Sequence, residues 1–253
     1  MKRKSVLSCL MAAVMLSLLL LCSGCGAQPS ASGEAQTAES ASQPVEAAAE
    51  PTAEPVEIPI DFDEWQSINS DVYAWITVPG TNIDYPVLQS GEDEPNDYYL
   101  EYCIDHTKGR PGAIYSEKDY NPKTFNDYVT ILYGHDMWSN DTYFHQLHLL
   151  EDKSFFDENR TVTVYTPDEI LNYTIFAVFN YDDRHLMMSN YGFTMASDKE
   201  NFLNEVFDIR DMTANIDQSM KDQAMEEESR ILILSTCNQI SEDQRYLTLA
   251  VLD

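Results

Sequence analysis

Short strand-like segments recur along most of the chain, and this recurrence limits the fold more than any other feature. Each segment is rich in β-branched or aromatic residues and is bounded by Gly, Pro, Asn or Asp, which end strands and form turns. Eight such segments occur: Trp75–Val78, Tyr85–Leu88, Gly112–Tyr115, Tyr128–Tyr133, Thr161–Tyr165, Leu171–Phe179, Ile231–Thr236 and Tyr246–Leu252. This number of short strands in 253 residues predicts a mainly β domain, built as a barrel or a sandwich.

Helical periodicity is confined to a few places. Apolar residues recur at helical spacing from Phe62 to Ile68, and a second short amphipathic stretch covers Val72 to Trp75, so N-terminal helices are expected. Further helices are predicted over Thr142–Leu150 and Asp198–Ile209. The last of these lies in a long connection before the strand Ile231–Thr236. Connections of that length are usually functional features.

Residues 1–25 form a targeting signal rather than part of the fold. The basic cluster Lys2-Arg3-Lys4 precedes an apolar run from Val6 to Leu21, which is the order of an export signal. The run is slightly shorter than the roughly 18–20 residues of a spanning helix. A signal peptide and an uncleaved signal anchor therefore remain open. The segment Leu21–Gly26 resembles a bacterial lipoprotein cleavage site with Cys25 as the lipidated residue. In either case the protein is expected to be extracytoplasmic and anchored to the cell membrane.

The charge of the chain is strongly acidic, with 15 Lys and Arg against 43 Asp and Glu and a formal net charge of −28. This excludes a protein that binds duplex nucleic acid, because such binding needs basic contacts to phosphate. Residues 26–59 consist almost only of Ala, Ser, Glu, Pro, Gln, Thr and Val, a composition that cannot form a packed core. They are predicted to be a disordered acidic linker, and residues 60–253 the globular domain.

Two cysteines remain after the leader, and Cys237 is distinguished by its place in the sequence. It follows the apolar run Ile231–Leu234 and lies at the C-terminal end of a buried strand. The chain then returns as a half-buried strand that begins at Arg245. If the two strands form a hairpin, Arg245 lies at the same end as Cys237, where a cation needs a partner such as a thiolate or a developing oxyanion. Cys103 is expected to be a structural thiol, although an exported domain could pair it with Cys237.

A nucleophilic thiol also needs a base, and His135 is the histidine best placed to be one. It follows the strand Tyr128–Tyr133 and can converge on Cys237 in a closed sheet. We expect His145 and His148 to be solvated side chains on a helix, and His185 to be solvated in a polar loop. A zinc site made of His135, His145 and His148 has no support, because the spacing matches no standard motif.

Together these elements resemble a sortase, one of the cysteine transpeptidases of Gram-positive cell surfaces. The resemblance is carried by Tyr133–Met137, Leu234–Cys237 and Arg245, in that order. It extends from about Trp65 to Leu252, and the helix-bearing connection before the Cys strand makes it similar to class B. The fold that it implies is an eight-stranded sortase-type β-barrel with N-terminal helices and a helix in that connection.

The resemblance also implies roles for individual residues. Cys237 is the expected nucleophile, His135 the general acid/base and Arg245 the oxyanion or substrate-orienting residue, with no cofactor and no metal. In sortases the Cys attacks the carbonyl after Thr in a C-terminal sorting signal, and an amine of peptidoglycan or its precursor resolves the thioester. The implied partners are a surface protein with a sorting signal, the peptidoglycan amine and, through the N-terminus, the membrane. Because only a thiolate is strongly nucleophilic, His135 must be imidazolium when Cys237 is ionised.

One departure from the family pattern concerns Asp136. Class B proteins often have Asn after the catalytic His, whereas this chain has a carboxylate. A carboxylate beside His135 is expected to favour the imidazolium form.

Two other classes of protein account for part of the sequence. A cell-wall cysteine endopeptidase would use the same residue types, but papain-like folds place the nucleophile before the His in the chain. A non-catalytic membrane-tethered binding module would explain the leader, the linker and the acidic β domain. It would leave Cys237, His135 and Arg245 at strand ends as a coincidence.

Overall fold

The computed structural model describes residues 57–109, 111–237 and 243–253. The predicted targeting signal, Cys25 and almost all of the predicted linker lie outside the described residues. Among the residues that are described, no helix has the length and apolar character needed to cross a membrane.

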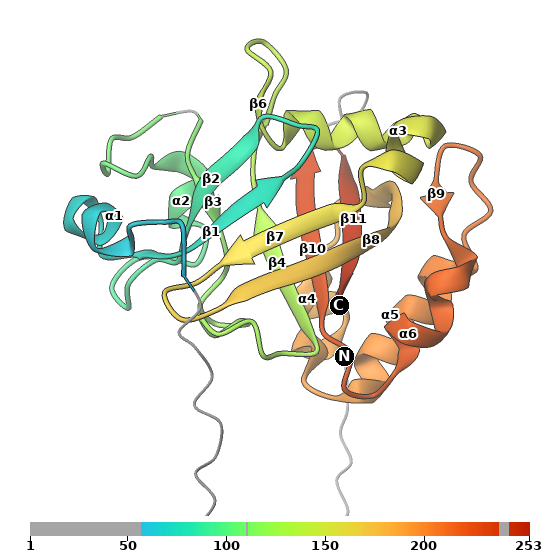
Figure 1. Ribbon diagram of the computed structural model, residues 1–253. Coiled ribbons are helices and arrows are strands. Elements are labelled where there is room, and N and C mark those ends of the chain that lie inside the picture. Colours follow the sequence, from blue (N-terminus) through green and yellow to red (C-terminus); the bar gives the residue numbers. More distant parts are fainter. Residues whose placement is uncertain (1–56, 110, 238–242) are drawn as a thin grey trace, which may run out of the picture. The chain divides into compact units, whose positions relative to one another are not determined.

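Eight strands close into a mixed β-barrel (Figure 1). They are β1 (Val72–Val78), β2 (Ile83–Leu88), β3 (Ile114–Tyr115), β4 (Val129–Tyr133), β7 (Thr161–Tyr165), β8 (Ile170–Asp182), β10 (Ile231–Cys237) and β11 (Gln244–Leu252). Their order is β11-β10-β4-β3-β2-β1-β7-β8, and pairing of β8 with β11 closes the barrel. All eight predicted strands are confirmed, and the closure decides for a barrel over a sandwich.

Three shorter strands lie outside this ring. The strands β5 (Asp136–Met137) and β6 (Thr142–Tyr143) pair with each other directly after β4. The strand β9 (Asn215–Ile216) pairs with Ala177 and Val178 of β8, beyond the part of β8 that pairs with β7.

The start of β1 corrects one prediction. The N-terminal helix over Phe62–Ile68 is confirmed as α1, but Val72–Trp75 is strand and not a second helix. The reason is that both faces of β1 are buried. Tyr73 and Ala74 belong to the barrel core, whereas Val72 and Trp75 pack in a separate cluster with Phe62 of α1. A strand buried on both faces loses the alternation of polar and apolar residues that identifies strands in a sequence.

Helices fill the connections between strands. The predicted helix 142–150 is a 3₁₀ helix, η1 (Phe144–Glu151), and the predicted helix 198–209 is α5 (Ala196–Phe207). The other helical segments are α2 (Tyr98–Glu101), α3 (Lys153–Glu158), α4 (Leu186–Ser189), η2 (Tyr191–Phe193), η3 (Gln218–Met220) and α6 (Lys221–Met225). In Figure 1, α5 and α6 lie against the outside of the barrel, on the side of β8.

The strand that carries Cys237 is buried from both sides. Leu232 and Leu234 pack inside the barrel, whereas Ile231 and Ile233 pack in an outer cluster with residues of α5 such as Phe202. Alternate side chains of a strand point to opposite faces, so cover on both faces explains the continuous apolar run of β10. The helix-bearing connection therefore stabilises the strand that ends at Cys237.

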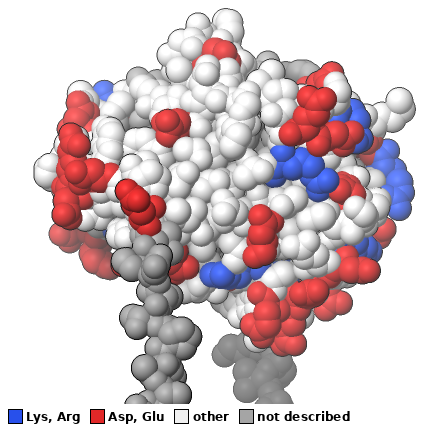
Figure 2. Space-filling model, in the orientation of Figure 1, with Lys and Arg blue, Asp and Glu red and all other residues white. Residues whose placement is uncertain are grey.

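The surface of the domain is strongly acidic. Residues 61–253 contain 12 Lys and Arg against 37 Asp and Glu. On the face shown in Figure 2, carboxylate residues lie along the edges and also within the face, whereas the basic residues gather mainly on the right side. Any anion formed on this domain therefore needs a local cation.

Lys199 of α5 joins the outer helices to the segment that leads into β10. Its side chain is 1% exposed, and its Nζ donates to the carbonyl oxygens of Glu226 (2.6 Å), Glu227 (3.0 Å) and Ser229 (2.9 Å). The ammonium also lies 5.5 Å from the ring centroid of Tyr128. Burial lowers the pKa of Lys199, and the neighbouring glutamates oppose this.

The substitution Lys199→Met is expected to lower the free energy of unfolding by about 1–3 kcal/mol, because it removes a buried ammonium that donates to three main-chain carbonyl oxygens. Urea denaturation of the two proteins measures this. The control is Lys153→Met, which removes an exposed ammonium paired with Asp157 and is expected to change stability by less than about 1 kcal/mol. Equal unfolding midpoints for Lys199→Met and the wild type would contradict the stabilising role.

Candidate active site

The parallel pairing of β4 and β10 brings His135 and Cys237 to the same end of the barrel. Tyr133 lies opposite Ser235 in this pair, and the N–H of Gly134 donates to the carbonyl of Ser235 at 3.1 Å. The two strands run in the same direction. Two residues beyond Tyr133 is His135, and two residues beyond Ser235 is Cys237. The predicted convergence of these two strand ends is confirmed.

Arg245 reaches the same place through an antiparallel pair. It lies directly opposite Cys237 in the β10–β11 hairpin and opposite Tyr181 in the pair of β11 with β8. Directly opposed residues of an antiparallel pair have Cα atoms about 4.5–5.5 Å apart. The side chain of Arg245 therefore begins beside that of Cys237, as the predicted hairpin requires.

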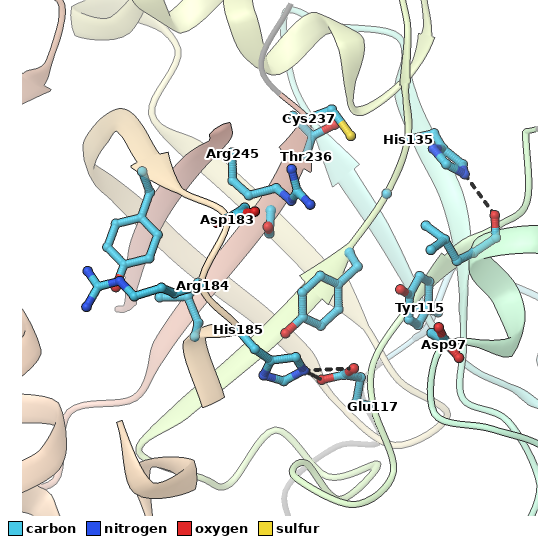
Figure 3. Close-up of a pocket in the computed structure, with 16 residues that line it drawn as sticks. Asp97, Tyr115, Glu117, His135, Asp183, Arg184, His185, Thr236, Cys237 and Arg245 are labelled. Atoms are coloured by element: carbon cyan, nitrogen blue, oxygen red, sulfur yellow. Dashed lines mark hydrogen bonds and ion pairs between the residues drawn. The ribbon is translucent and has the colours of Figure 1, made fainter. Parts of the chain in front are cut away.

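A cavity of about 380 Å³ opens at this end of the barrel, and Cys237, His135 and Arg245 all line it (Figure 3). Its other walls include Tyr115, Tyr133, Tyr181, Asp97, Glu117, Asp183, Arg184, His185, Ser235 and Thr236. His135 is 7% exposed, whereas Cys237 is partly exposed. In Figure 3 the sulfur of Cys237 points to the side on which His135 lies. The structure thus brings the three predicted site residues together.

The ring of His135 is oriented by a main-chain carbonyl. Its Nε2–H donates to the carbonyl oxygen of Leu100 at 2.8 Å. In the neutral ring the proton is then on Nε2, and Nδ1 is the basic nitrogen. The same contact is possible when the ring is doubly protonated, because Nε2 carries its hydrogen in both states. The sequence did not indicate Leu100, because a main-chain carbonyl has no residue signature.

The helix α2, which carries Leu100, is held by buried polar contacts. The hydroxyl of Tyr99 donates to Asp71 Oδ2 (2.7 Å) and accepts from Asn69 Nδ2 (2.8 Å). Burial raises the pKa of Tyr99, and the hydrogen bond to Asp71 raises it further, so the hydroxyl remains protonated. The N–H of Ala113 donates to the Tyr99 carbonyl at 2.9 Å. These contacts link the chain around α1 and β1 to the carbonyl that orients His135.

His185 is not the solvated loop residue that was expected. It lines the cavity, and its Nε2 lies 3.0 Å from Glu117 Oε2. The ring of Tyr133 stacks on Tyr115 with centroids 5.4 Å apart on the same wall. Burial raises the pKa of Tyr133, and the charge of Glu117 raises it further, so this tyrosine stays neutral. Neutral tyrosines and a paired carboxylate therefore form this wall.

His145 and His148 also differ from the prediction of solvated side chains. Both contact Asp136: His145 Nδ1 lies 2.6 Å from Oδ1, and His148 Nε2 lies 3.5 Å from Oδ2. The Asp136 carboxylate therefore pairs with η1, and the hypothesis that it favours the imidazolium form of His135 stays a prediction. Within residues 57–109, 111–237 and 243–253, no cluster of His, Cys, Asp or Glu could hold a metal ion.

Cys103 lies apart from the cavity. Both Cys103 and Cys237 are free thiols, so the alternative that they form a disulfide is wrong. The Sγ of Cys103 lies 3.8 Å from the carbonyl oxygen of Gly109, in the connection between β2 and β3. Of these two thiols, Cys237 lines the cavity with His135 and Arg245.

Comparison with known proteins identifies the fold and the site together. The model of the sortase domain matches residues 76–253. The chain belongs to the sortase family. It is 33% identical over 183 residues to sortase B of Listeria monocytogenes, across 72% of this chain and 69% of that relative. Class B sortases are its relatives, and the chain is accordingly a cysteine transpeptidase. This assignment decides against the endopeptidase and the non-catalytic binding module.

Solved structures of class B sortases share the barrel. A Streptococcus pyogenes class B sortase involved in pilus biogenesis superposes with a TM-score of 0.64 at 29% identity, over 77% of this chain and 98% of that one. A Staphylococcus aureus sortase B-substrate complex has a TM-score of 0.58 at 25% identity, over 76% of this chain and 84% of that one.

Gly112 permits the close approach that holds α2. It has φ +65°, and a Cβ there would lie 2.4 Å from the Tyr99 carbonyl oxygen and 2.8 Å from that of Leu100. The substitution Gly112→Ala must therefore move the carbonyl that orients His135. We expect a loss of about tenfold or more in kcat/KM, since small displacements of catalytic groups are costly. The ¹⁵N signal of His135 Nε2 should also lose its hydrogen-bonded shift.

The matched control lies in the same connection between β2 and β3. A Cβ at Gly91 would meet no atom within 4 Å, and its φ is not in the left-handed region, so Gly91→Ala is expected to behave as wild type. Unchanged kcat/KM and an unchanged His135 spectrum in Gly112→Ala would show that the Leu100 carbonyl does not orient the base.

Proposed function

We propose that this transpeptidase cleaves a C-terminal sorting signal after Thr through a thioester at Cys237 and transfers the surface protein to an amine of peptidoglycan or its precursor. The observation that carries the proposal is the meeting of Cys237, His135 and Arg245 in one cavity. The proposal is also supported by the substrate complex of the Staphylococcus aureus relative, which has the same fold.

The first half-reaction uses the thiolate of Cys237 and the imidazolium of His135. The sulfur attacks the main-chain carbonyl carbon of that Thr, and the carbonyl oxygen becomes an oxyanion. Arg245, opposite Cys237 in the hairpin, supplies a positive charge for the thiolate and for the oxyanion. The C–N bond then breaks, and His135 gives its Nδ1 proton to the leaving amine. The thioester and a neutral imidazole remain.

The second half-reaction reverses these proton transfers. An incoming amine attacks the thioester carbon, and the neutral His135 accepts the proton that the amine loses. The amide forms, and Cys237 leaves as a thiolate beside a renewed imidazolium. The Leu100 carbonyl accepts from Nε2–H in both states of the ring, so the base keeps one orientation throughout.

The test is to incubate the full-length protein with peptides that carry candidate sorting signals and with an amine. An amide-exchange product is expected, and Cys237→Ala is expected to abolish it, with a loss of more than about 1,000-fold. The matched control is Cys103→Ala, which removes a thiol outside the cavity and should retain activity. Cleavage to the free acid alone would indicate a hydrolase, and turnover by Cys237→Ala would contradict the assigned nucleophile.

We further propose that the enzyme works outside the cytoplasm of a Gram-positive bacterium, anchored to the cell membrane through its N-terminus. The support is the basic cluster followed by the apolar run Val6–Leu21 and by Cys25. A lipid on Cys25 would make the protein incorporate labelled fatty acid in cells, and Cys25→Ser would prevent this. A signal anchor would leave the protein unlabelled, in the membrane fraction and uncleaved. Recovery of the wild type in the soluble cytoplasmic fraction would contradict both forms of anchoring.

A further inference from the structure

His148 is a buried histidine beside the active site for which the transpeptidation steps have no use. It lies on η1, its side chain is 10% exposed, and its ring stacks on Tyr246 with centroids 4.5 Å apart. Its Nδ1 lies 2.9 Å from Glu151 Oε1. The ring is therefore fixed on one face by packing and at one edge by a carboxylate.

The other edge of the ring contacts the main chain of the nucleophile. His148 Nε2 lies 3.3 Å from the carbonyl oxygen of Cys237 and donates a hydrogen bond to it. The same nitrogen lies 3.5 Å from Asp136 Oδ2, and Asp136 directly follows His135. One imidazole thus touches the chain at both strand ends that carry the predicted base and nucleophile.

The register of the sheet explains why a donor is needed there. The carbonyl of Ser235 accepts from Gly134 on the β4 side of β10. Carbonyls of alternate residues in a strand point to the same side, so the carbonyl of Cys237 also faces the β4 side. The strand β4 ends at Tyr133, and Asp136, which would come next on this side, pairs instead with Tyr143 in the pair of β5 and β6. His148 supplies the hydrogen bond that a longer strand would have made.

A second histidine of η1 holds the other strand end. His145 Nδ1 lies 2.6 Å from Asp136 Oδ1, and the N–H of Phe144 donates to the carbonyl of His135 at 3.1 Å. The 3₁₀ helix therefore contacts the main chain of His135, the side chain of Asp136 and the main chain of Cys237. We call η1 a brace because it contacts the chain at the ends of both β4 and β10.

We propose that His148 is a positioning residue for the transpeptidase: its Nε2–H fixes the main chain of Cys237 against the segment that follows His135, and so sets the separation of nucleophile and base. The proposal rests on the proposed function for the roles of Cys237 and His135. His148 is not among the residues that line the cavity, and it acts through Cys237 and His135.

Two substitutions in the full-length protein test the hydrogen bond. His148→Phe keeps a ring to stack on Tyr246 but has no donor, and His148→Gln keeps an N–H donor. We expect kcat of His148→Phe to fall about tenfold or more with KM within about twofold, because a displaced nucleophile lowers kcat without changing binding. His148→Gln is expected to recover most of the lost kcat. A purely structural role would lower the thermal midpoint without this rescue by the donor.

The matched control is Glu151→Gln, which removes the carboxylate at Nδ1 and leaves the contact of Nε2 with Cys237. It is expected to keep kcat within about twofold of the wild type, because the Gln amide can still hydrogen-bond to Nδ1 while Nε2 keeps its contact with Cys237. A wild-type kcat in His148→Phe would overturn the proposal. An equal loss in His148→Phe and His148→Gln would also overturn it, by assigning the effect to the imidazole ring rather than to the donated bond.

Alkylation of Cys237 by iodoacetamide gives a readout that needs no peptide substrate. The rate is followed by mass spectrometry on the peptide that contains Cys237, because the full-length chain has four other cysteines. It is expected to fall in His148→Phe and to return in His148→Gln. If no peptide is turned over by the wild type, the proposed function fails while the alkylation rates still test the brace. Equal alkylation rates in the wild type and both variants would overturn the positioning role.

Discussion

The parallel pairing of β4 with β10 is the constraint on which the rest of the site depends. Parallel strands cannot be joined by a tight turn, so the chain between them must travel around the molecule before it returns. Here that crossover contains β7, β8 and the helices that cover β10 from outside. The crossover therefore adds β7 and β8 to the barrel and covers the outer face of the strand that bears Cys237. It also returns the chain so that β10 ends beside His135, which follows β4.

Main-chain carbonyl groups take part in orienting the residues at this end of the barrel. The carbonyl of Leu100 accepts from Nε2 of His135, and the carbonyl of Cys237 accepts from Nε2 of His148. The predicted base His135 and the predicted nucleophile Cys237 both lie just past the last ladder bond between β4 and β10. Two segments outside the ring add contacts here. Leu100 of α2 contacts the side chain of His135, and His148 of η1 contacts the main chain of Cys237.

Because the protein is acidic, a thiolate at Cys237 depends on positive charges close to it. A thiolate in a domain with 37 acidic and 12 basic residues must be stabilised by groups within a few ångströms. Arg245, which lies opposite Cys237, is the predicted cation for this role, and Glu117 on the cavity wall is paired with His185. The distant carboxylates matter less, because water and salt screen exposed charges beyond about 8–10 Å.

Much of the fold could be predicted from local sequence patterns, because the residue types in strands and turns reflect their burial and their backbone conformation. The eight strands, α1, α5 and the places of Cys237, His135 and Arg245 at strand ends were all predictable in this way. The same reasoning failed at Val72–Trp75, where burial of both faces removed the alternation, and at His148 and His185, which pattern alone assigned to solvent. The sequence by itself therefore determined which residues could do the chemistry and which segments would form the barrel. Only the tertiary structure decided that the Leu100 carbonyl orients His135 and that η1 contacts both strand ends, because these contacts depend on the register between segments far apart in the chain.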